Sequence, residues 1–282
     1  MEIKRAAILG FCFGVRRAVE LAEKALDENK GKKVFSLGPL IHNEAALKKL
    51  SDKGLQIIEE NLLSELPESS VVIIRAHGVA PQIIDLLEKK NSIIIDATCP
   101  RVKASQKMVE KYTCQNDYVI LTGDKNHGEV KGIAGYAGKN FSLVENIADV
   151  ESLDIAEPEK INVILLSQTT YSQRQFDEIE KSLKAKFPNI AVMNTICPAT
   201  KERQDSLLEL CAQVEGVIVI GGKNSANTIR LFQTAKNNCK NAVHIQSASE
   251  IPEEFRKLKS VGITAGASTP DEIIGEVEQS LS

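Results

Sequence analysis

The chain has no tryptophan, and aromatic residues make up only 4% of its 282 residues, so we expect an aliphatic core. No apolar run approaches the ~18 residues that a membrane-spanning helix needs. No charged-then-apolar leader precedes the first apolar run. These absences predict a cytoplasmic protein that has no membrane partner.

Several functional classes also lack support. A net charge of −3 supplies no basic excess for phosphate backbones, which argues against a nucleic-acid partner. Neither G-x-G-x-x-G nor G-x-x-x-x-G-K-[ST] occurs, so no motif indicates nucleotide binding. Six cysteines are present, but a chain of this length in a reducing compartment needs no disulfides.

One pattern occurs three times: a short apolar run, a cysteine, and then a stretch of good helix formers. The runs with their cysteines are Ala6–Cys12, Ile93–Cys99 and Ala191–Cys197, and helices are expected over Val15–Asp27, Val102–Tyr112 and Thr200–Val214. Proline directly after Cys99 and Cys197 suits the first position of a helix. A thiolate at a helix N-terminus is stabilised by the helix dipole and is a good ligand for soft metals.

Each cysteine unit is followed by further apolar runs in the same order, which are typical of parallel strands covered on both faces. These runs are 34–38, 55–59 and 71–74, then 118–123, 141–145 and 163–166, and finally 217–222, 242–246 and 261–265. The repeat predicts three small α/β domains with mainly parallel sheets, arranged with pseudo-threefold symmetry around a central site. The expected boundaries are 1–98, 99–196 and 197–282. The neighbour with which each cysteine strand pairs stays open.

Parallel α/β sheets bind ligands beyond the carboxyl ends of their strands. The turns at those ends carry most of the reactive side chains of this chain. They are Cys12, Cys99 and Cys197 in one set, His42, His127, Ser225 and Asn227 in another, and His77, Thr169 and Ser268 in a third. We expect these turns to face one pocket.

Three widely spaced thiolates leave three interpretations open. An iron–sulfur cluster can take three cysteines and keep one iron open. Zinc would need a fourth ligand and is usually bound by closely spaced pairs, which are absent. The third interpretation is three unrelated core thiols. The other cysteines, Cys114, Cys211 and Cys239, lie outside the repeated turns and are expected to be structural.

The polar turn residues indicate an anion site. Three of the four histidines, His42, His77 and His127, fall at strand ends. Together with hydroxyl and amide side chains near helix N-termini, they suit a diphosphate. Glu129 is the only carboxylate among the turn residues named, which makes it a candidate proton donor. A solvated glutamate at a helix start is the alternative. His244 is expected to be structural.

Basic residues follow each cysteine, although cations in the first turn oppose the helix dipole. They are Arg16 and Arg17, Arg101 and Lys103, and Lys201 and Arg203. They could balance the charge of a cluster or bind an acidic electron donor, and solvated side chains are the alternative.

At these residues the chain resembles the 4-hydroxy-3-methylbut-2-enyl diphosphate reductase family (IspH/LytB), whose members act last in the non-mevalonate isoprenoid pathway. The matching motifs run through essentially the whole chain, from residues 10–15 through 41–43, 75–79, 96–100, 127–129, 168–170, 196–200 and 224–227 to 265–268.

The resemblance implies a [4Fe–4S] cluster, one per chain, held by Cys12, Cys99 and Cys197 with the fourth iron open to the substrate hydroxyl. It implies diphosphate binding by His42, His77, His127, Ser225, Asn227 and Ser268, and proton delivery by Glu129 with Thr169. It also implies a ferredoxin-type or flavodoxin-type electron donor, and isopentenyl and dimethylallyl diphosphate as products. Two other interpretations compete: another three-lobed iron–sulfur enzyme such as quinolinate synthase, and a non-catalytic metal-dependent scaffold or sensor.

Overall fold

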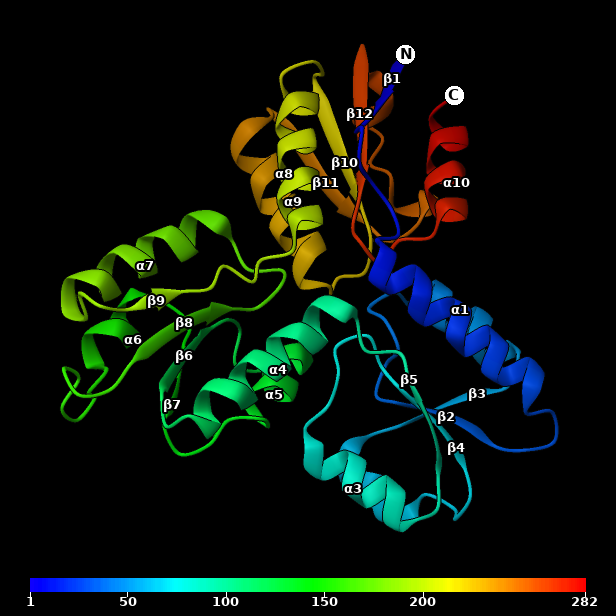
Figure 1. Ribbon diagram of the computed structural model, residues 1–282. Coiled ribbons are helices and arrows are strands. Elements are labelled where there is room, and N and C mark those ends of the chain that lie inside the picture. The colour runs from blue at the N-terminus through cyan, green and yellow to red at the C-terminus, as the bar shows by residue number, and fades with distance from the viewer. The chain divides into compact units, whose positions relative to one another are not determined.

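The computed structural model describes residues 1–282 and consists of α/β elements throughout (Figure 1). The chain forms two compact units. The first unit comprises Met1–Glu20, Pro39–Leu55 and Pro198–Ser282, and the second comprises Leu21–Gly38 and Gln56–Cys197. None of the helices combines the length and the apolar character that a membrane crossing requires.

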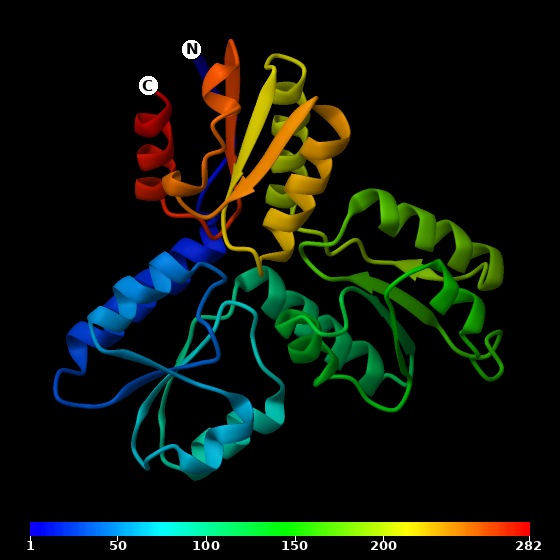
Figure 2. The same ribbon diagram turned by 180° about the vertical axis from the view of Figure 1, so that it is seen from behind.

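The first unit contains one four-stranded parallel sheet, here called the third sheet, in the order β11-β10-β12-β1. Its strands are β1 (Glu2–Arg5), β10 (Gly216–Ile220), β11 (Asn241–Ile245) and β12 (Ser260–Ala265), and the helices of this unit include α2 (Glu44–Asp52), α8 (Pro198–Cys211), α9 (Ala226–Asn238) and α10 (Asp271–Leu281). Helices α8 and α9 cover one face of the sheet and α10 covers the other (Figures 1 and 2).

The two faces of the third sheet have separate aliphatic cores because successive side chains of a strand point to opposite faces. Val217 and Val219 of β10 pack with Leu207 and Leu231 from α8 and α9. Ile218 and its neighbours on the opposite face pack with the apolar side of α10. The aliphatic core expected from the scarcity of aromatic residues is confirmed.

The second unit contains the other two parallel sheets. The first sheet has the order β3-β2-β4-β5 and the second has the order β7-β6-β8-β9. The strands of the first sheet are β2 (Val34–Leu37), β3 (Leu55–Ile58), β4 (Val71–Ile74) and β5 (Ile93–Asp96); those of the second are β6 (Tyr118–Thr122), β7 (Phe141–Val144), β8 (Val163–Ser167) and β9 (Ala191–Val192). The associated helices are α3 (Pro81–Lys89), α4 (Pro100–Cys114), α5 (Gly128–Ala134), α6 (Ile147–Ser152) and α7 (Gln173–Lys186), and α1 (Phe13–Glu28) continues into this unit from the first.

Alternation along β6 again divides the core of the second sheet between its faces. Val119 and Leu121 pack with residues of α4 and α5. Ile120 packs on the other face with Phe176 and Leu183 of α7. The strands are therefore covered on both sides, as continuous apolar runs predict.

The three sheets have the same strand order, which confirms the α/β class and the threefold sequence repeat. The edge strand next to each cysteine turn pairs with the last strand of a repeat, as β5 with β4, β9 with β8 and β1 with β12. The N-terminal strand thus completes the C-terminal sheet. The domain boundaries at 98/99 and 196/197, and the arrangement around a common axis, stay predictions.

One expected strand was misplaced. The apolar run Ala6–Leu9 is not a strand, and the strand lies earlier, at Glu2–Arg5. After β1 the chain bends, because the Ile8 N–H donates to the Ser206 hydroxyl at 3.1 Å and Gly10 adopts a positive φ of 76°. The three helices expected after the cysteines are present as α1, α4 and α8.

Candidate functional site

Each repeated cysteine lies directly before a helix. Cys12 precedes α1, Cys99 is the N-cap residue of α4, and Cys197 precedes α8. The main-chain N–H of each cysteine donates to a carbonyl in the turn after the last strand of a repeat: Cys12 to Ala267 at 3.1 Å, Cys99 to Ala76 at 2.9 Å, and Cys197 to Thr169 at 2.8 Å. The same main-chain hydrogen bond therefore occurs at the cysteine of each sequence repeat.

The three thiols have the chemistry that an iron–sulfur cluster requires. All three are partly buried and none forms a disulfide. Pro100 and Pro198 open the helices behind two of them, which leaves the N-terminal end of each helix facing its cysteine. Soft sulfur donors at positive helix ends, each on a main chain held by a hydrogen bond, fit a cluster with thiolate ligands.

In the second unit, Glu129 and Thr169 form a buried polar pair. The Glu129 carboxylate accepts the Thr169 main-chain N–H at 2.6 Å and the Thr169 hydroxyl at 2.8 Å. Both residues are almost inaccessible, with 2% and 6% of their surfaces exposed. The alternative of a solvated glutamate at a helix start is therefore wrong.

His127 lies beside this pair as the N-cap of α5. Its Nδ1 accepts the Glu129 main-chain N–H at 3.2 Å, so a neutral His127 ring carries its proton on Nε2. The ring of His77, from the turn after β4, meets the His127 ring edge-to-face at a centroid distance of 5.2 Å. The second unit thus gathers His77, His127, Glu129 and Thr169, and the single pocket expected for all the turns stays a prediction.

The main-chain hydrogen bonds of the three cysteines identify one further candidate position, Thr170, that the sequence analysis did not single out. The carbonyls that accept from the cysteines belong to Ala76, Thr169 and Ala267, so the next residues, His77, Thr170 and Ser268, are the structurally equivalent set. Thr170, half-buried, receives a hydrogen bond from the Gln168 amide at 3.1 Å. Grouping Thr169 with His77 and Ser268 was therefore one residue out of register.

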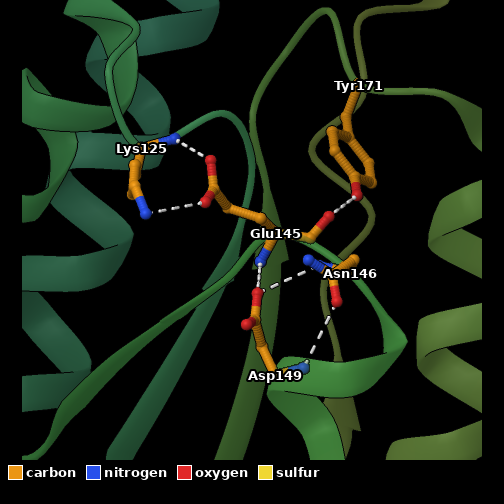
Figure 3. A network of polar contacts seen from close by, with 5 residues as sticks. All are labelled: Lys125, Glu145, Asn146, Asp149 and Tyr171. Carbon is orange, nitrogen blue, oxygen red and sulfur yellow. Dashed lines mark hydrogen bonds and ion pairs between the residues drawn. The ribbon is translucent and has the colours of Figure 1, made fainter.

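Glu145, directly after β7, contacts two turns through Lys125 and Tyr171 (Figure 3). Its carboxylate accepts the Lys125 main-chain N–H at 2.8 Å and lies 3.4 Å from the Lys125 ammonium group. Its carbonyl accepts the hydroxyl of the buried Tyr171 at 2.6 Å. Lys125 precedes His127 by two residues and Tyr171 follows Thr169 by two, so one residue holds both turns.

Glu145 is held in turn by the start of α6. Its N–H donates to the Asp149 carboxylate at 2.7 Å, and Asn146 forms a capping box with Asp149 (Figure 3). The third sheet repeats this arrangement with Lys223, whose N–H donates to Gln246 at 3.0 Å and whose ammonium group pairs with Glu250 at 2.9 Å. The repeat therefore extends to side chains that support the turns.

The second set of turns begins at equivalent glycines. Gly38, Gly123 and Gly221 follow the second strand of each repeat and donate to the last residues of the third strands, Ile58, Val144 and Ile245, at 2.8, 3.2 and 2.9 Å. Four residues later the chain reaches His42, His127 and Ser225. His42, His127 and Ser225 therefore occupy equivalent positions in the three repeats, as their grouping in the sequence predicted.

The remaining polar candidate residues lie in the first unit. The turn of His42 packs directly on the turn before α9, because a Cβ on Gly222 would lie 2.4 Å from the His42 carbonyl oxygen. Ser225 is the N-cap of α9 and accepts the Thr228 N–H at 3.3 Å. Ser268 lies half-buried in the turn after β12, next to the residue that binds the Cys12 N–H.

Asn227, in the first turn of α9, has an unsatisfied donor. It is 6% exposed, and its buried Nδ2 has no hydrogen-bond partner. A buried amide donor left without a partner costs about 1–3 kcal/mol, so its retention suits an anion acceptor. This residue supports the expected anion site at the α9 N-terminus.

The basic residues after the cysteines differ in environment. Arg203 is 3% exposed and donates to the carbonyl of Gly10 at 2.8 Å and to that of Ala199 at 3.0 Å. It thus holds the segment that carries Cys12. Lys103 pairs with Asp96, and the hydrogen bonds from Lys103 and Thr98 lower the pKa of Asp96 although burial opposes this.

The residues outside the repeated turns have structural environments. Burial, assisted by Cys239, raises the pKa of the Cys211 thiol to about 11. Nε2 of His244 lies 2.9 Å from the Gly221 carbonyl oxygen, and its ring contacts Phe232. The structural role expected for His244 agrees with these contacts.

Comparison with known proteins gives consistent matches along the whole chain. The family model described as LytB protein matches residues 3–282. The chain is 45% identical to a 4-hydroxy-3-methylbut-2-enyl diphosphate reductase of Treponema denticola, over 100% of this chain and 99% of the relative. It is 42% identical to the enzyme of the same name from Aquifex aeolicus, over 100% and 96%.

Two solved structures are also similar. The E-1-hydroxy-2-methyl-but-2-enyl-4-diphosphate reductase from Plasmodium falciparum superposes with a TM-score of 0.93 at 32% identity, covering 99% of this chain and 87% of that chain. An (E)-4-hydroxy-3-methyl-but-2-enyl diphosphate reductase, described as the terminal enzyme of the non-mevalonate pathway, gives a TM-score of 0.74 at 40% identity, covering 100% and 99%.

Proposed function

Because this chain belongs to the LytB protein family, we infer that it reduces (E)-4-hydroxy-3-methylbut-2-enyl diphosphate, the last step of the non-mevalonate pathway. The substrate takes up two electrons and two protons, loses its allylic hydroxyl as water, and becomes isopentenyl or dimethylallyl diphosphate. The observation that carries this inference is the family match over residues 3–282, which includes every candidate site residue. The relatives described above are all named as diphosphate reductases, which favours this activity over quinolinate synthesis or a non-catalytic scaffold.

We propose that Cys12, Cys99 and Cys197 hold one [4Fe–4S] cluster and leave its fourth iron open. Their partly buried sulfurs at helix N-termini support this assignment. When bound, such a cluster would pass the two electrons from the external donor to the substrate one at a time and would offer a Lewis-acidic iron for the leaving oxygen. Arg203 donates to the Gly10 carbonyl and thereby stabilises the turn that carries Cys12. Its guanidinium also places a positive charge near this turn.

Glu129 is the proposed proton donor. Its carboxyl group is buried and directed by two hydrogen bonds from Thr169, which hold it in one orientation. A protonated carboxyl there can protonate the departing hydroxyl, and Thr169 relays a proton through its own hydroxyl. Burial excludes bulk water from this transfer.

The diphosphate is assigned to His42, His77, His127, Ser225, Asn227 and Ser268. The edge-to-face contact of His77 with His127 and the unsatisfied amide of Asn227 support this assignment. A histidine that donates from Nε2, an amide and two hydroxyls supply the donors that phosphate oxygens accept. Thr170 joins the set because it is equivalent to His77 and Ser268 in main-chain bonding.

The electron donor is proposed to be a ferredoxin-type or flavodoxin-type protein, and the expected location is the cytoplasm. Exposed cations after the cysteines, such as Arg101 and Lys201, suit an acidic donor. Arg203 is excluded from this surface by its burial.

The test uses anaerobically prepared holoprotein and its Glu129→Gln variant, with Glu178→Gln on the exposed side of α7 as the matched control. Iron and sulfide content, Mössbauer spectra with and without substrate, and turnover with a chemical reductant are measured. We expect intact clusters in all three proteins and a turnover loss of roughly a hundredfold or more in Glu129→Gln only. Wild-type turnover in Glu129→Gln would remove Glu129 from the mechanism, and an iron-free wild-type protein that stays active would refute the cluster.

A further inference from the structure

We propose that Arg75 is a positioning residue that fixes the spacing of the His77 and His127 turns in the second unit and thereby sets the affinity for the diphosphate group. The proposal deepens the proposed function and depends on it, because it concerns the same anion site. Arg75 directly follows β4 and precedes His77 by two residues.

The Arg75 guanidinium is held in one place by a single ion pair. Its Nη2 lies 2.8 Å from Oε1 of Glu60, and its side chain is only 13% exposed. The Nε of Arg75 is buried and has no hydrogen-bond partner. Retention of a cation with an unsatisfied donor indicates that packing, rather than a complete set of hydrogen bonds, selects this side chain.

The packing partners of the guanidinium are two glycine backbones. A Cβ on Gly38 would lie 2.3 Å from Nη1, and a Cβ on Gly128 would lie 3.1 Å from Nη2. Gly38 also has a positive φ of 68°, which favours glycine independently. The planar group therefore fills a slot whose walls are the main chains of these two residues.

The slot is adjacent to each histidine turn along the chain. Gly128 lies between His127 and Glu129, and Gly38 precedes His42 by four residues. Arg75 itself belongs to the turn of His77. One side chain therefore belongs to the turn of His77 and contacts the main chain next to His127.

The rest of α5 also packs closely against the segment that follows Arg75. A Cβ on Gly132 would lie 3.2 Å from the carbonyl of Gly78, and one on Gly135 would lie 2.3 Å from the Cβ of Ala80. The main chain of α5 thus packs directly against the segment from Arg75 to Ala80. The guanidinium contacts this helix at Gly128, which directly follows His127 in the chain.

A side chain that sets the separation of two ligand-binding turns affects the affinity for the ligand. The donors to a diphosphate must keep fixed separations, and a displacement of about 1 Å in such a set costs up to ~100-fold in function. Glutamine at position 75 loses both the charge and the planar fork, whereas lysine keeps the charge and loses the shape. A comparison of Arg75→Gln with Arg75→Lys therefore separates the contribution of the charge from that of the planar shape.

The experiment measures binding of inorganic pyrophosphate to anaerobic holoprotein by calorimetry, together with kcat and KM for the allylic diphosphate and iron content. Arg75→Gln and Arg75→Lys are compared with Arg5→Gln, which removes another arginine–glutamate pair next to a strand. We expect Arg75→Gln and Arg75→Lys to raise the pyrophosphate Kd and the KM by roughly tenfold or more, with cluster content unchanged and kcat affected less. Arg5→Gln should bind as the wild type does.

Three outcomes would overturn the proposal: wild-type pyrophosphate affinity in Arg75→Gln, full recovery in Arg75→Lys, or an equal loss in Arg5→Gln. If Arg75→Gln does not fold, Gly128→Ala tests the same slot by crowding the guanidinium, and unchanged affinity in that variant contradicts the positioning role. Failure of the proposed function is distinguishable, because it appears as wild-type protein that does not reduce the allylic diphosphate at all.

Discussion

The Glu129 carboxylate receives two hydrogen bonds from one residue, Thr169, at 2.6 Å from its main-chain N–H and 2.8 Å from its hydroxyl. The main-chain bond fixes the position of the carboxylate, and the hydroxyl bond connects it to a group that can pass a proton on. Because the Thr169 carbonyl also accepts the Cys197 N–H, the same residue bonds to the proposed proton donor, Glu129, and to a cysteine turn.

The Thr169→Val variant tests the hydroxyl alone. Valine keeps the branched shape and the main-chain bond to Glu129 but removes the side-chain donor. We expect kcat to fall by roughly 10- to 100-fold while KM and the iron content stay near wild-type values. Thr169→Ser is the matched control, since it keeps the hydroxyl, and it should retain most of the activity. Equal losses in the two variants would assign the effect to packing.

The cysteine assignment is tested by single serine substitutions. Replacing Cys99 removes a partly buried sulfur at the start of α4, whereas replacing Cys114 changes an exposed residue at the end of the same helix. We expect Cys99→Ser to lose or degrade the cluster and Cys114→Ser to keep wild-type iron and sulfide content. Equal cluster content in the two variants, measured anaerobically, would contradict thiolate ligation by Cys99.

A substitution at Asn227 tests the anion site that we propose at the start of α9. Asn227→Asp keeps the size of the side chain but replaces the unsatisfied Nδ2 donor with a negative charge. We expect KM for the diphosphate substrate to rise by roughly tenfold or more, because like charges repel and a donor is lost. Asn238→Asp, at the exposed end of the same helix, serves as the control. An unchanged KM in Asn227→Asp would remove this residue from the site.

Much of this organisation is readable from the sequence because it depends on local signals. The proline after Cys99 and Cys197, the apolar runs and the turn residues each predict an element from its own neighbours. The repeat then multiplies the signal, because three weak patterns in one order support the same fold. The positions of His127 and Glu129 in the turn region after β6 follow from these signals.

The remaining features depend on contacts between distant segments. The pairing of β1 with β12 joins Glu2 to Ser260, and no local pattern specifies such a partner. The misplaced strand at Ala6–Leu9 has the same cause, since its apolar residues serve a bend that Ser206 holds. Likewise, the burial of Arg203 depends on the Gly10 carbonyl, far away in sequence.

The register of the polar turns also required the structure. Thr169 and Thr170 are chemically similar, so the sequence alone does not decide which one is equivalent to His77. The hydrogen bond from Cys197 decides it. The close packing at Gly128 and Gly132 of α5 was not predicted for a related reason. A glycine indicates the close approach of another segment only when that segment is known.

The pH dependence of stability is expected to include a contribution from Asp96, which lies just before Cys99 in the chain. Burial raises the pKa of Asp96, but hydrogen bonds from Lys103 and Thr98 outweigh it, so the pKa in the folded protein lies below its ordinary value. A carboxyl group with a depressed pKa stabilises the fold above its unfolded pKa of about 3.9 and loses this contribution as the pH falls through the folded value. Both partners are more than one-third exposed, so the contribution is about 0.5 kcal/mol after screening. Thermal unfolding of wild type and Asp96→Asn between pH 7 and pH 2 should show a Tm difference at neutral pH that disappears in acid, and a difference that persists unchanged at the acid end would show that the variant acts through packing instead.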